Sequence, residues 1–364
     1  MSIFDQKVIK YEMKPLSSLE KVFPDETPVY RMECQMLSGL WGETVSFQVA
    51  YTGDFVMRER LDVRVVSELA EHVHVRTVEM VPVGRATNGI VDDNYLKTTS
   101  GLYPDLLKDL KDGKVIVYSR QWRSLWVDVD ITNEIPAGEY EIELQLIKEG
   151  EVVCSAKQKV TVIGTELPKL DIMHTEWMHA DCLADYYHVE VFSEEHWKLL
   201  ENYFQEYVKR DCNMMLTPLF TSPLDTAIGL ERTTCQLIDV EVKDGEYVFG
   251  FAKLKRWIDL CKKCGIEYFE MSHLFSQWGA KYAPKVVATV NGKKEKIFGW
   301  HTPAVGEYTK FLESFLPQLT AKLRKWEIAD VTYFHISDEP REEHLESYKA
   351  AKESLGNAGR ISHI

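Results

Sequence analysis

The sequence lacks long hydrophobic runs and any excess of basic residues. Among its 364 residues, no uninterrupted apolar stretch approaches the roughly 20 residues that a membrane-spanning helix requires. Lys and Arg number 43 against 57 Asp and Glu, so the formal net charge is −14. Nucleic acids and anionic membranes both bind basic surfaces, so this balance excludes both as partners. It also disfavours acidic substrates and leaves neutral ligands as the expected class.

The sequence also lacks the short motifs of several common enzyme classes. It contains no Gly-rich phosphate-binding loop and no Gly-x-Ser-x-Gly elbow, so nucleotide binding and serine hydrolysis have no support. There is no His-Glu-x-x-His motif and no facial triad of metal ligands. We therefore expect neither a cofactor nor a metal ion. The first residues, Met1–Pro15, hold no apolar signal-peptide core, which predicts either a cytoplasmic location or a protein expressed without its leader.

Cysteine is sparse, with 7 residues scattered along the chain. An odd number without regular spacing predicts reduced thiols rather than a disulfide framework. Cys261 and Cys264 have the spacing of a redox pair, but they fall in the last turn of a predicted helix, just before Gly265. Redox pairs use a helix N-terminus to lower the thiol pKa, and no second Cys or His pair follows at zinc spacing. We expect these two cysteines to be structural.

Residues 1–165 contain short runs rich in β-branched and aromatic residues, many of which alternate apolar with polar positions. Turn signals such as Pro136–Gly138 and Lys148–Gly150 separate them. The predicted strands are Ser46–Tyr51, Leu61–Val66, His72–Met80, Lys114–Tyr118, Ser124–Ile131, Glu139–Ile147 and Val152–Val162. Short strands at this spacing predict an antiparallel β-sandwich domain.

Residues 166–364 instead alternate strand-like and helix-like segments. The predicted strands are Leu170–Trp177, Asn213–Leu219, Gly265–His273 and Ile328–Ile336. One helix begins after Ser193, a suitable N-cap, and the others are Phe251–Cys264, Pro303–Trp326 and Glu342–Leu355. Repeated strand–helix units with right-handed crossovers predict a parallel sheet, and in this case a (β/α)8 TIM-type barrel.

The second half is short for a closed barrel. About four strand–helix units are present, whereas a barrel has eight strands and commonly about 250 residues. Arg360–Ile364 has the composition of a fifth strand that is just beginning. We therefore expect residues 166–364 to form the N-terminal half of a catalytic barrel domain that is cut short. Open sheet edges and exposed apolar surface would then favour oligomers or aggregates.

Two adjacent carboxylates, Asp338 and Glu339, stand where the apolar run Thr332–Ile336 ends. A structural explanation is that Ser337 or Asp338 caps a helix, with Pro340 near its first position. The catalytic explanation is that carboxylates at the carboxyl end of a buried strand are suited to acid/base chemistry. Two like charges held close cannot both ionise easily, so one carboxyl would keep its proton and serve as the acid.

Polar and aromatic side chains also follow the other predicted strands and would converge at the same edge of a parallel sheet. The candidate substrate-binding residues are Trp177, His179, Asp181, His273, Gln277, Trp278 and His335. Indole faces stack on sugar C–H groups, while amides and carboxylates bind hydroxyls, so the set is typical of a carbohydrate site. Each residue also has a structural alternative, since Trp177 and Trp278 could pack in the core.

Several segments of the second half resemble the DUF4091 catalytic domain, which is related to glycoside hydrolase family 123. They are His174–Asp181, Leu216–Phe220, Ser222–Thr226, Glu231–Leu237, Ser272–Ala280, Ile297–Trp300 and Phe334–Pro340. The first half matches by its organisation rather than by motifs. The resemblance implies a β-sandwich followed by a (β/α)8 barrel.

The resemblance also implies a retaining, substrate-assisted exo-β-N-acetylgalactosaminidase acting on a neutral glycan or N-acetylhexosaminide. In such an enzyme the 2-acetamido oxygen of the substrate is the nucleophile, so no nucleophilic carboxylate is needed. Glu339 is then the implied general acid and later base, and Asp338 holds the acetamido N–H and stabilises the oxazolinium ion. By the same resemblance, Trp177 and the other candidate binding residues shape the sugar pocket.

Two other functions stay open. A conventional retaining glycosidase would use Glu339 as acid/base and take its nucleophile from a later strand. A non-catalytic carbohydrate-binding protein would have its half barrel stabilised by a partner chain.

Overall fold

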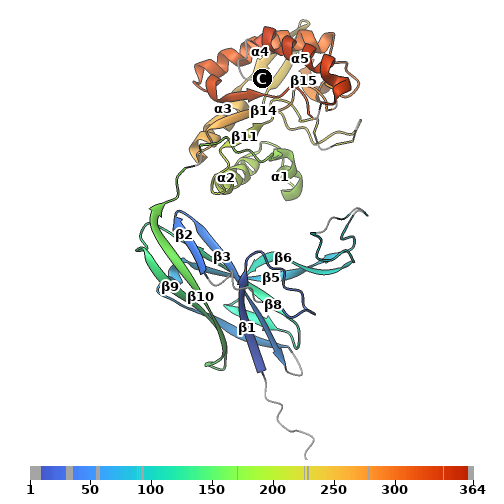
Figure 1. Ribbon diagram of the computed structural model, residues 1–364. Coiled ribbons are helices and arrows are strands. Elements are labelled where there is room, and N and C mark those ends of the chain that lie inside the picture. Colours follow the sequence, from blue (N-terminus) through green and yellow to red (C-terminus); the bar gives the residue numbers. More distant parts are fainter. Residues whose placement is uncertain are drawn as a thin grey trace, which may run out of the picture. The chain divides into compact units, whose positions relative to one another are not determined.

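The computed structural model describes residues 10–29, 36–54, 58–87, 89, 91, 94–169, 171–224, 226–227, 229–277, 279–338 and 340–359. The chain forms two compact units, Met1–Lys169 and Leu170–Ile364, and each has its own hydrophobic core (Figure 1). Within the described residues, no helix has the length and apolar character needed to cross a membrane.

The first unit consists of two five-stranded β-sheets that pack face to face (Figure 1). One sheet has the order β1-β3-β8-β5-β6, with β1 Lys10–Ser17, β3 Thr44–Asp54, β5 Val73–Val83, β6 Gly101–Asp109 and β8 Arg123–Asp130. The other has the order β2-β10-β9-β4-β7, with β2 Met36–Trp41, β4 Glu59–Val66, β7 Lys114–Val117, β9 Gly138–Lys148 and β10 Glu151–Glu166. The 3-10 turn η2 covers Ala70–His72.

The alternation of apolar residues explains the packing of these sheets. Successive side chains of a strand point to opposite faces, so every second residue reaches the core. The buried hydrophobic residues of β8 and β9 follow this period of two and are Leu125, Val127, Val129, Ile142, Leu144 and Leu146. The arrangement agrees in outline with the predicted sandwich.

One strand pair departs from the predicted antiparallel arrangement. β2 pairs with the edge of β10 in parallel, with Val160 opposite Leu37. The reason lies in the turn that follows β2, where Gly42 adopts a φ of 97° and leads directly into β3 of the other sheet. That tight connection fixes the direction in which β2 runs, so the prediction of a purely antiparallel sandwich is wrong at this edge.

The second unit is built on a three-stranded parallel sheet of order β11-β14-β17. Its strands are β11 Met214–Thr217, β14 Tyr268–Met271 and β17 Thr332–Phe334. The helices are α1 Ala180–Tyr187, α2 Glu194–Val208, α3 Ala252–Cys264, α4 Glu307–Lys325 and α5 Leu345–Gly359, with 3-10 turns η3 Ala329–Val331 and η4 Glu342–His344. Ser193 caps α2 as predicted, because its hydroxyl accepts a hydrogen bond from the His196 N–H at 3.2 Å.

The first strand predicted for this unit, Leu170–Trp177, is reduced to an isolated parallel bridge between Thr175 and Met214. Side chains take over the hydrogen bonds that a ladder would make. The Asn213 side chain accepts from the His174 N–H at 2.8 Å, and the Tyr207 hydroxyl accepts from the Glu176 N–H at 2.7 Å. The described residues therefore supply three parallel strands rather than the predicted four. The predicted strand at Arg360–Ile364 lies outside the described residues.

Two β-hairpins that the sequence analysis did not predict are inserted into the strand–helix connections. They are β12 Asp239–Lys243 with β13 Glu246–Gly250, and β15 Val286–Val290 with β16 Lys293–Phe298. The first follows β11 and the second follows β14, so both extend from the carboxyl ends of parallel strands. β12 and β15 pair in parallel and join the hairpins into one four-stranded sheet.

The Cys261 and Cys264 thiols at the end of α3 are both free. Burial raises the pKa of the Cys261 thiol well above its ordinary value, and burial likewise raises the pKa of Cys264. Protonated, packed thiols of this kind are poor nucleophiles, in keeping with the structural role expected for them.

Candidate functional site

The carboxyl ends of β14 and β17 continue as two segments that run side by side. The Phe275 N–H donates to the carbonyl oxygen of Ile336 at 3.1 Å, and the Ser337 hydroxyl donates to the carbonyl oxygen of Ser276 at 2.8 Å. This register brings Gln277 against Asp338, whose Oδ2 accepts a hydrogen bond from the Gln277 amide at 3.2 Å. Two residues predicted to share a site, 61 positions apart, are thus in direct contact.

Glu270, on β14, stands at the centre of the polar side chains at this edge. It is only 3% exposed, and its carboxylate accepts hydrogen bonds from the Thr175 hydroxyl at 2.8 Å and from the Trp177 indole at 3.0 Å. The His335 Nε2 contacts the same oxygen as Trp177. Glu270 therefore ties together the segment before β11, the strand β14 and the segment after β17.

These hydrogen-bond partners keep the Glu270 carboxyl ionised. Burial alone would raise the pKa of this carboxyl, but the hydrogen bonds from His335, Thr175 and Trp177, together with the charge of His335, lower it. A buried carboxylate with several donors stays ionised because each donor stabilises the charged form. The site consequently keeps a fixed negative charge on Glu270, facing His335.

His273 lies beside this cluster and is electrically neutral. Its ring stacks on the His335 ring with centroids 4.4 Å apart, and the side chain is 2% exposed. Burial, with a smaller effect from the charge of His335, lowers the pKa of His273 to about 3. Its Nδ1 is buried and has no hydrogen-bond partner among the described residues. A neutral imidazole with a spare ring nitrogen can bind a hydroxyl or an amide of a ligand.

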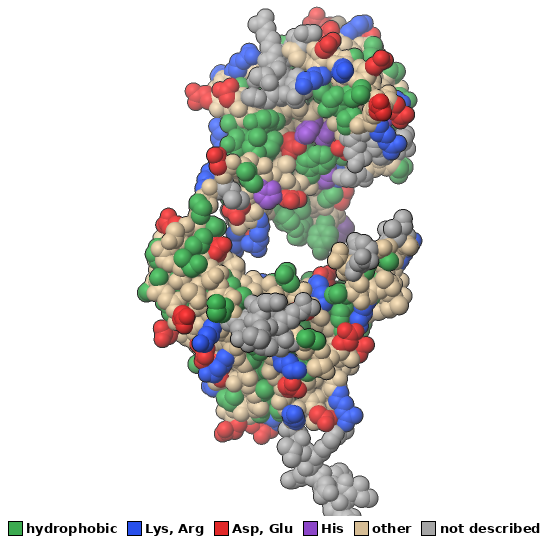
Figure 2. Space-filling view, in the orientation of Figure 1, with side chains coloured by type: hydrophobic (Ala, Val, Ile, Leu, Met, Phe, Trp, Pro, Cys, Tyr) green, Lys and Arg blue, Asp and Glu red, His purple; other side chains and the backbone are tan. Residues whose placement is uncertain are grey.

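The Trp177 side chain is fixed in position by its neighbours but is partly exposed to solvent. Its indole nitrogen is fixed to Glu270, and its ring meets the rings of His273 and His335 edge-on at 5.3 and 6.0 Å. The side chain is 38% exposed, so part of the indole is available to a ligand. Figure 2 shows histidine side chains gathered with acidic and hydrophobic ones on one face of the second unit.

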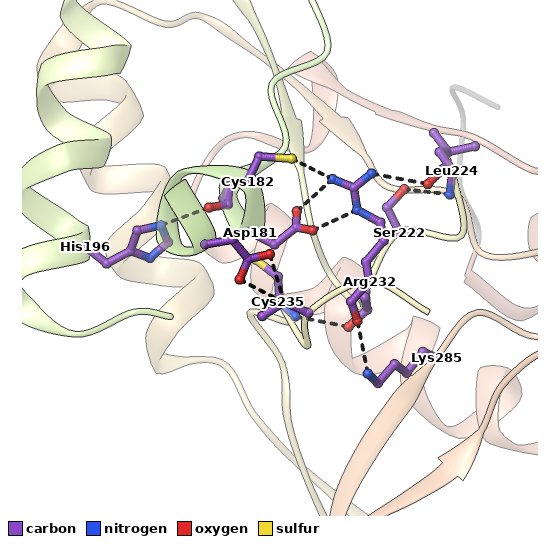
Figure 3. A network of polar contacts seen from close by, with 12 residues as sticks. Asp181, Cys182, His196, Ser222, Leu224, Arg232, Cys235 and Lys285 are labelled. Carbon is purple, nitrogen blue, oxygen red and sulfur yellow. Dashed lines mark hydrogen bonds and ion pairs between the residues drawn. The ribbon is translucent and has the colours of Figure 1, made fainter. Parts of the chain in front are cut away.

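His179 and Asp181 lie at the start of α1. His179 is the N-cap residue of that helix, and its charge contributes to lowering the pKa of His273. Asp181 is buried, and its carboxylate accepts hydrogen bonds from the Arg232 Nε at 2.8 Å and Nη2 at 3.2 Å (Figure 3). The backbone carbonyl of Arg232 in turn accepts from the Lys285 ammonium at 3.1 Å. Asp181 thus anchors α1 to the loop that follows β11.

Two predicted site residues, Trp278 and Glu339, lie outside the described residues. The turn that follows these residues is capped by a residue other than the two predicted. The 3-10 turn η4 begins at Glu342 with Arg341 as its N-cap residue, and the hydroxyl of Ser337 bonds to Ser276. Neither Ser337 nor Asp338 caps a helix, because both residues bond to the 272–277 segment instead and the next turn begins only at Glu342.

A cavity of about 460 Å³ adjoins Gln277. Its other lining residues are Lys281, Tyr282, Trp300, Arg341, Glu343 and His344. The Trp300 indole nitrogen donates to the carbonyl oxygen of Leu230 at 3.0 Å, which fixes the ring at the cavity wall. A cavity with aromatic walls and a few polar groups is typical of small-molecule sites.

Two residues of this region were missed as site candidates. Glu270 carried a signal, because a charged residue inside the short apolar strand Tyr268–Met271 must be paired if it is buried. Trp300 ends one of the family-like segments and could have been selected for that reason. Among the described residues, no group of three or more His, Cys, Asp and Glu side chains has the arrangement of a metal site.

Comparisons with known proteins place this geometry in context. A family model described as the glycoside hydrolase 123 catalytic domain matches residues 177–364. A solved family 123 glycoside hydrolase from Clostridium perfringens, studied for glycolipid glycan hydrolysis, is 14% identical with a TM-score of 0.69. The match covers 94% of this chain and 60% of that one, so the chain spans less than two thirds of its solved relative. No curated protein matches the chain.

Two further solved structures match weakly and carry no argument. A β-glucosidase from Listeria innocua in complex with isofagomine is 10% identical with a TM-score of 0.21, covering 44% of this chain and 17% of that one. The N-terminal domain of PorA is 11% identical with a TM-score of 0.21, covering 40% and 99%. The family model alone spans more than half of the sequence and includes every residue of the cluster around Glu270 except Thr175. The chain belongs to glycoside hydrolase family 123.

Proposed function

We propose that this protein is a glycoside hydrolase, a retaining exo-β-N-acetylgalactosaminidase that works by substrate assistance. In this proposal, residues 1–165 form a β-sandwich domain, and residues 166–364 form the N-terminal half of a (β/α)8 barrel that carries the catalytic carboxylates. Family membership supports the reaction class. The contact between Gln277 and Asp338 is the observation that carries the proposed mechanism, because it positions one carboxylate oxygen and leaves the other available.

The proposed reaction has two steps. In the first, the acetamido oxygen of the substrate bonds to C1, while the bond from C1 to the leaving oxygen breaks and that oxygen takes the proton of Glu339. The Asp338 carboxylate accepts a hydrogen bond from the acetamido N–H and stabilises the positive charge of the oxazolinium ion. In the second, water attacks C1, gives a proton to Glu339 and reopens the ring, so configuration is retained. The nucleophile belongs to the substrate, which is why adjacent carboxylates suffice.

The proposal assigns the surrounding residues to substrate binding. The partly exposed Trp177 ring would stack on the sugar, and the unpartnered Nδ1 of His273 would bind a polar substituent. Gln277, Trp278, His179 and His335 would complete the pocket for a neutral glycan. Asp181 would act indirectly, through the anchoring of α1 by Arg232.

The conventional mechanism would require a carboxylate that is free to attack C1. Among the described residues, Glu270 is the buried carboxylate at the centre of the cluster, but Thr175 occupies one of its oxygens, and Trp177 and His335 occupy the other. With both oxygens engaged, Glu270 is poorly suited to forming a glycosyl ester, so the conventional mechanism would have to take its nucleophile from a later strand.

The test uses the protein expressed from its complete reading frame and an aryl β-N-acetylgalactosaminide. Asp338→Asn and Glu339→Gln should each lower kcat/KM by about 10²–10⁴-fold, since each removes a group that acts in the transition state. The matched control is Glu342→Gln, which neutralises an exposed carboxylate close in sequence and should leave the rate unchanged.

A thiazoline that mimics the oxazolinium ion should inhibit the wild-type enzyme and bind Asp338→Asn more weakly. A trapped covalent glycosyl-enzyme would instead identify the conventional mechanism. Sugar binding without turnover of any aryl glycoside would identify a non-catalytic carbohydrate-binding protein.

A further inference from the structure

The first unit contains a cavity of about 530 Å³ that is lined by residues of this unit alone. Both sheets contribute to its walls, with Tyr51 from β3 and Thr77–Met80 from β5 on one side and residues of β4 and β7 on the other. A volume of this size is within the range of small-molecule sites, about 300–1,000 Å³.

The lining of this cavity is basic, in contrast to the net charge of −14 for the whole chain. Its cationic side chains are Arg60, Lys108, Lys111, Lys114 and Arg123. Two of them have carboxylate partners outside the lining, since Arg60 bonds Asp112 at 2.8 Å and Lys114 bonds Asp62 at 3.0 Å. Lys108, Lys111 and Arg123 have no ion-pair partner among the described residues.

The carboxylates that face the cavity are themselves engaged. The Glu79 carboxylate accepts a hydrogen bond from the Thr77 hydroxyl at 2.8 Å, and Asp109 lies 3.7 Å from the Arg76 Nε. The lining thus holds five basic side chains against two acidic ones. Such an excess of basic side chains favours the binding of an anion.

Arg123 provides the second, independent observation. Its Nε is buried and has no hydrogen-bond partner within the described residues, although the side chain lines the cavity. The rest of the guanidinium is held in place, because one Nη donates to the Gln121 side chain at 3.1 Å and the group lies over the Tyr118 ring at 5.0 Å. A buried donor without a partner is costly, and the guanidinium also keeps N–H donors on its other Nη for a ligand oxygen.

We propose that this cavity is a binding site for an acidic saccharide, whose carboxylate or sulfate group bonds to Arg123 between Lys108 and Lys111. A fixed guanidinium matches the geometry of such oxyanions, and the Tyr118 ring beside it offers an apolar face to the sugar. The site is independent of the catalytic proposal. It gives the first unit a recognition role for charged glycans, a ligand class that the net charge of the whole chain disfavours.

The experiment measures binding to the whole chain by calorimetry. The probes are glucuronic acid, N-acetylglucosamine 6-sulfate, neutral N-acetylglucosamine and inorganic sulfate. We expect the two acidic sugars to bind with an affinity that falls as salt rises, and the neutral sugar to bind at least about tenfold more weakly. Equal binding of neutral and acidic sugars, or binding of inorganic sulfate alone, would overturn the proposal.

Variants locate the site. Arg123→Gln should weaken binding of the acidic sugars about tenfold or more, because it removes the charge and the buried donor. Arg64→Gln is the matched control, since Arg64 lies on β4 bonded to Gln145 and outside the cavity lining. If Arg123→Gln does not fold, Lys108→Gln tests the same site at an exposed position. Unchanged affinity in a folded lining variant contradicts the proposal, whether or not the enzyme is active.

Discussion

Glu270 illustrates how a single buried charge can organise the groups around it. Moving a carboxylate out of water is costly unless hydrogen bonds replace the lost solvent. Thr175, Trp177 and His335 supply those bonds, and in doing so they are themselves fixed in position. The orientation of the Trp177 ring and the stacking of His335 on His273 therefore depend on one carboxylate that needs no contact with substrate.

His273 makes the stability of the protein depend on pH. Its pKa falls from 6.5 to about 3 on folding, so between these values the unfolded chain binds a proton that the folded chain does not. Stability from this group is therefore complete above pH 6.5 and declines as the pH falls toward 3. Between pH 7.5 and pH 5 this single group should lower the free energy of unfolding by about 2 kcal/mol.

Urea unfolding of wild type and His273→Gln at both pH values checks this expectation. The loss of stability on acidification should be about 2 kcal/mol smaller in the variant, which has no imidazole to protonate. His301→Gln replaces an exposed histidine and should leave the loss unchanged. An identical loss in wild type and His273→Gln would show that the buried imidazole is not responsible.

Single residues of the candidate site could be predicted where they stand at strand ends. Asp338 and Gln277 were both selected in this way, and they are in contact. Glu270 was not selected, because it lies within a strand and its partners are 65 to 95 positions away. Local pattern gives the position of a residue on its strand, whereas the pairing of a buried charge depends on segments that meet only in the fold.

At the scale of elements, the segment between β14 and β15 depends on Gly279. This residue has a φ of 109°, and a Cβ placed there would lie 2.9 Å from the His344 ring. Gly279→Ala should lower the free energy of unfolding by about 2–4 kcal/mol through backbone strain and this clash. It should also lower kcat/KM, because Gln277 lies two residues away and must reach Asp338.

Gly292→Ala is the control that separates the cost of backbone strain from the cost of the clash with His344. Gly292 also has a positive φ, of 80°, but a Cβ there would meet no atom within 4 Å. Its substitution should cost only about 1–2 kcal/mol and leave kcat/KM unchanged. Urea unfolding and aryl glycoside hydrolysis measure both quantities. Equal effects of the two substitutions would argue that the contact with His344 does not matter.

Elements with a strong local signal were predicted well, and inserted ones were not. The helix α2 combined the Ser193 cap with an apolar face, and both are present. The two hairpins carried a signal too, since Asp244–Gly245 and Asn291–Gly292 are turn pairs in which both residues have positive φ. They went unpredicted because a regular strand–helix alternation leaves no place for them.

At the scale of the whole molecule, the two units have separate hydrophobic cores. Leu125 belongs to one core and Leu200 to the other, and both are 0% exposed. Truncation to Ala should cost each unit about 2–5 kcal/mol and lower its melting temperature by about 5–15 °C. Scanning calorimetry should show two transitions, with Leu125→Ala shifting one and Leu200→Ala the other.

The two variants control each other, because the residue type and burial are the same. A single transition that both substitutions shift equally would show that the units unfold together. The change of sequence pattern near residue 165 predicted two regions of different character. The number of strands in the parallel sheet of the second region was predicted less well, since strand pairing is a property of the whole sheet and not of any local segment.

The order in which the chain is synthesised determines when each partner of Glu270 becomes available. Thr175 and Trp177 leave the ribosome before Glu270, whereas His335 follows 65 residues later. A nascent second unit can therefore dock its upstream segment early, but its buried carboxylate lacks the His335 partner until the residues that follow β17 have been synthesised. The cluster around Glu270 is complete only when that segment has formed its contact.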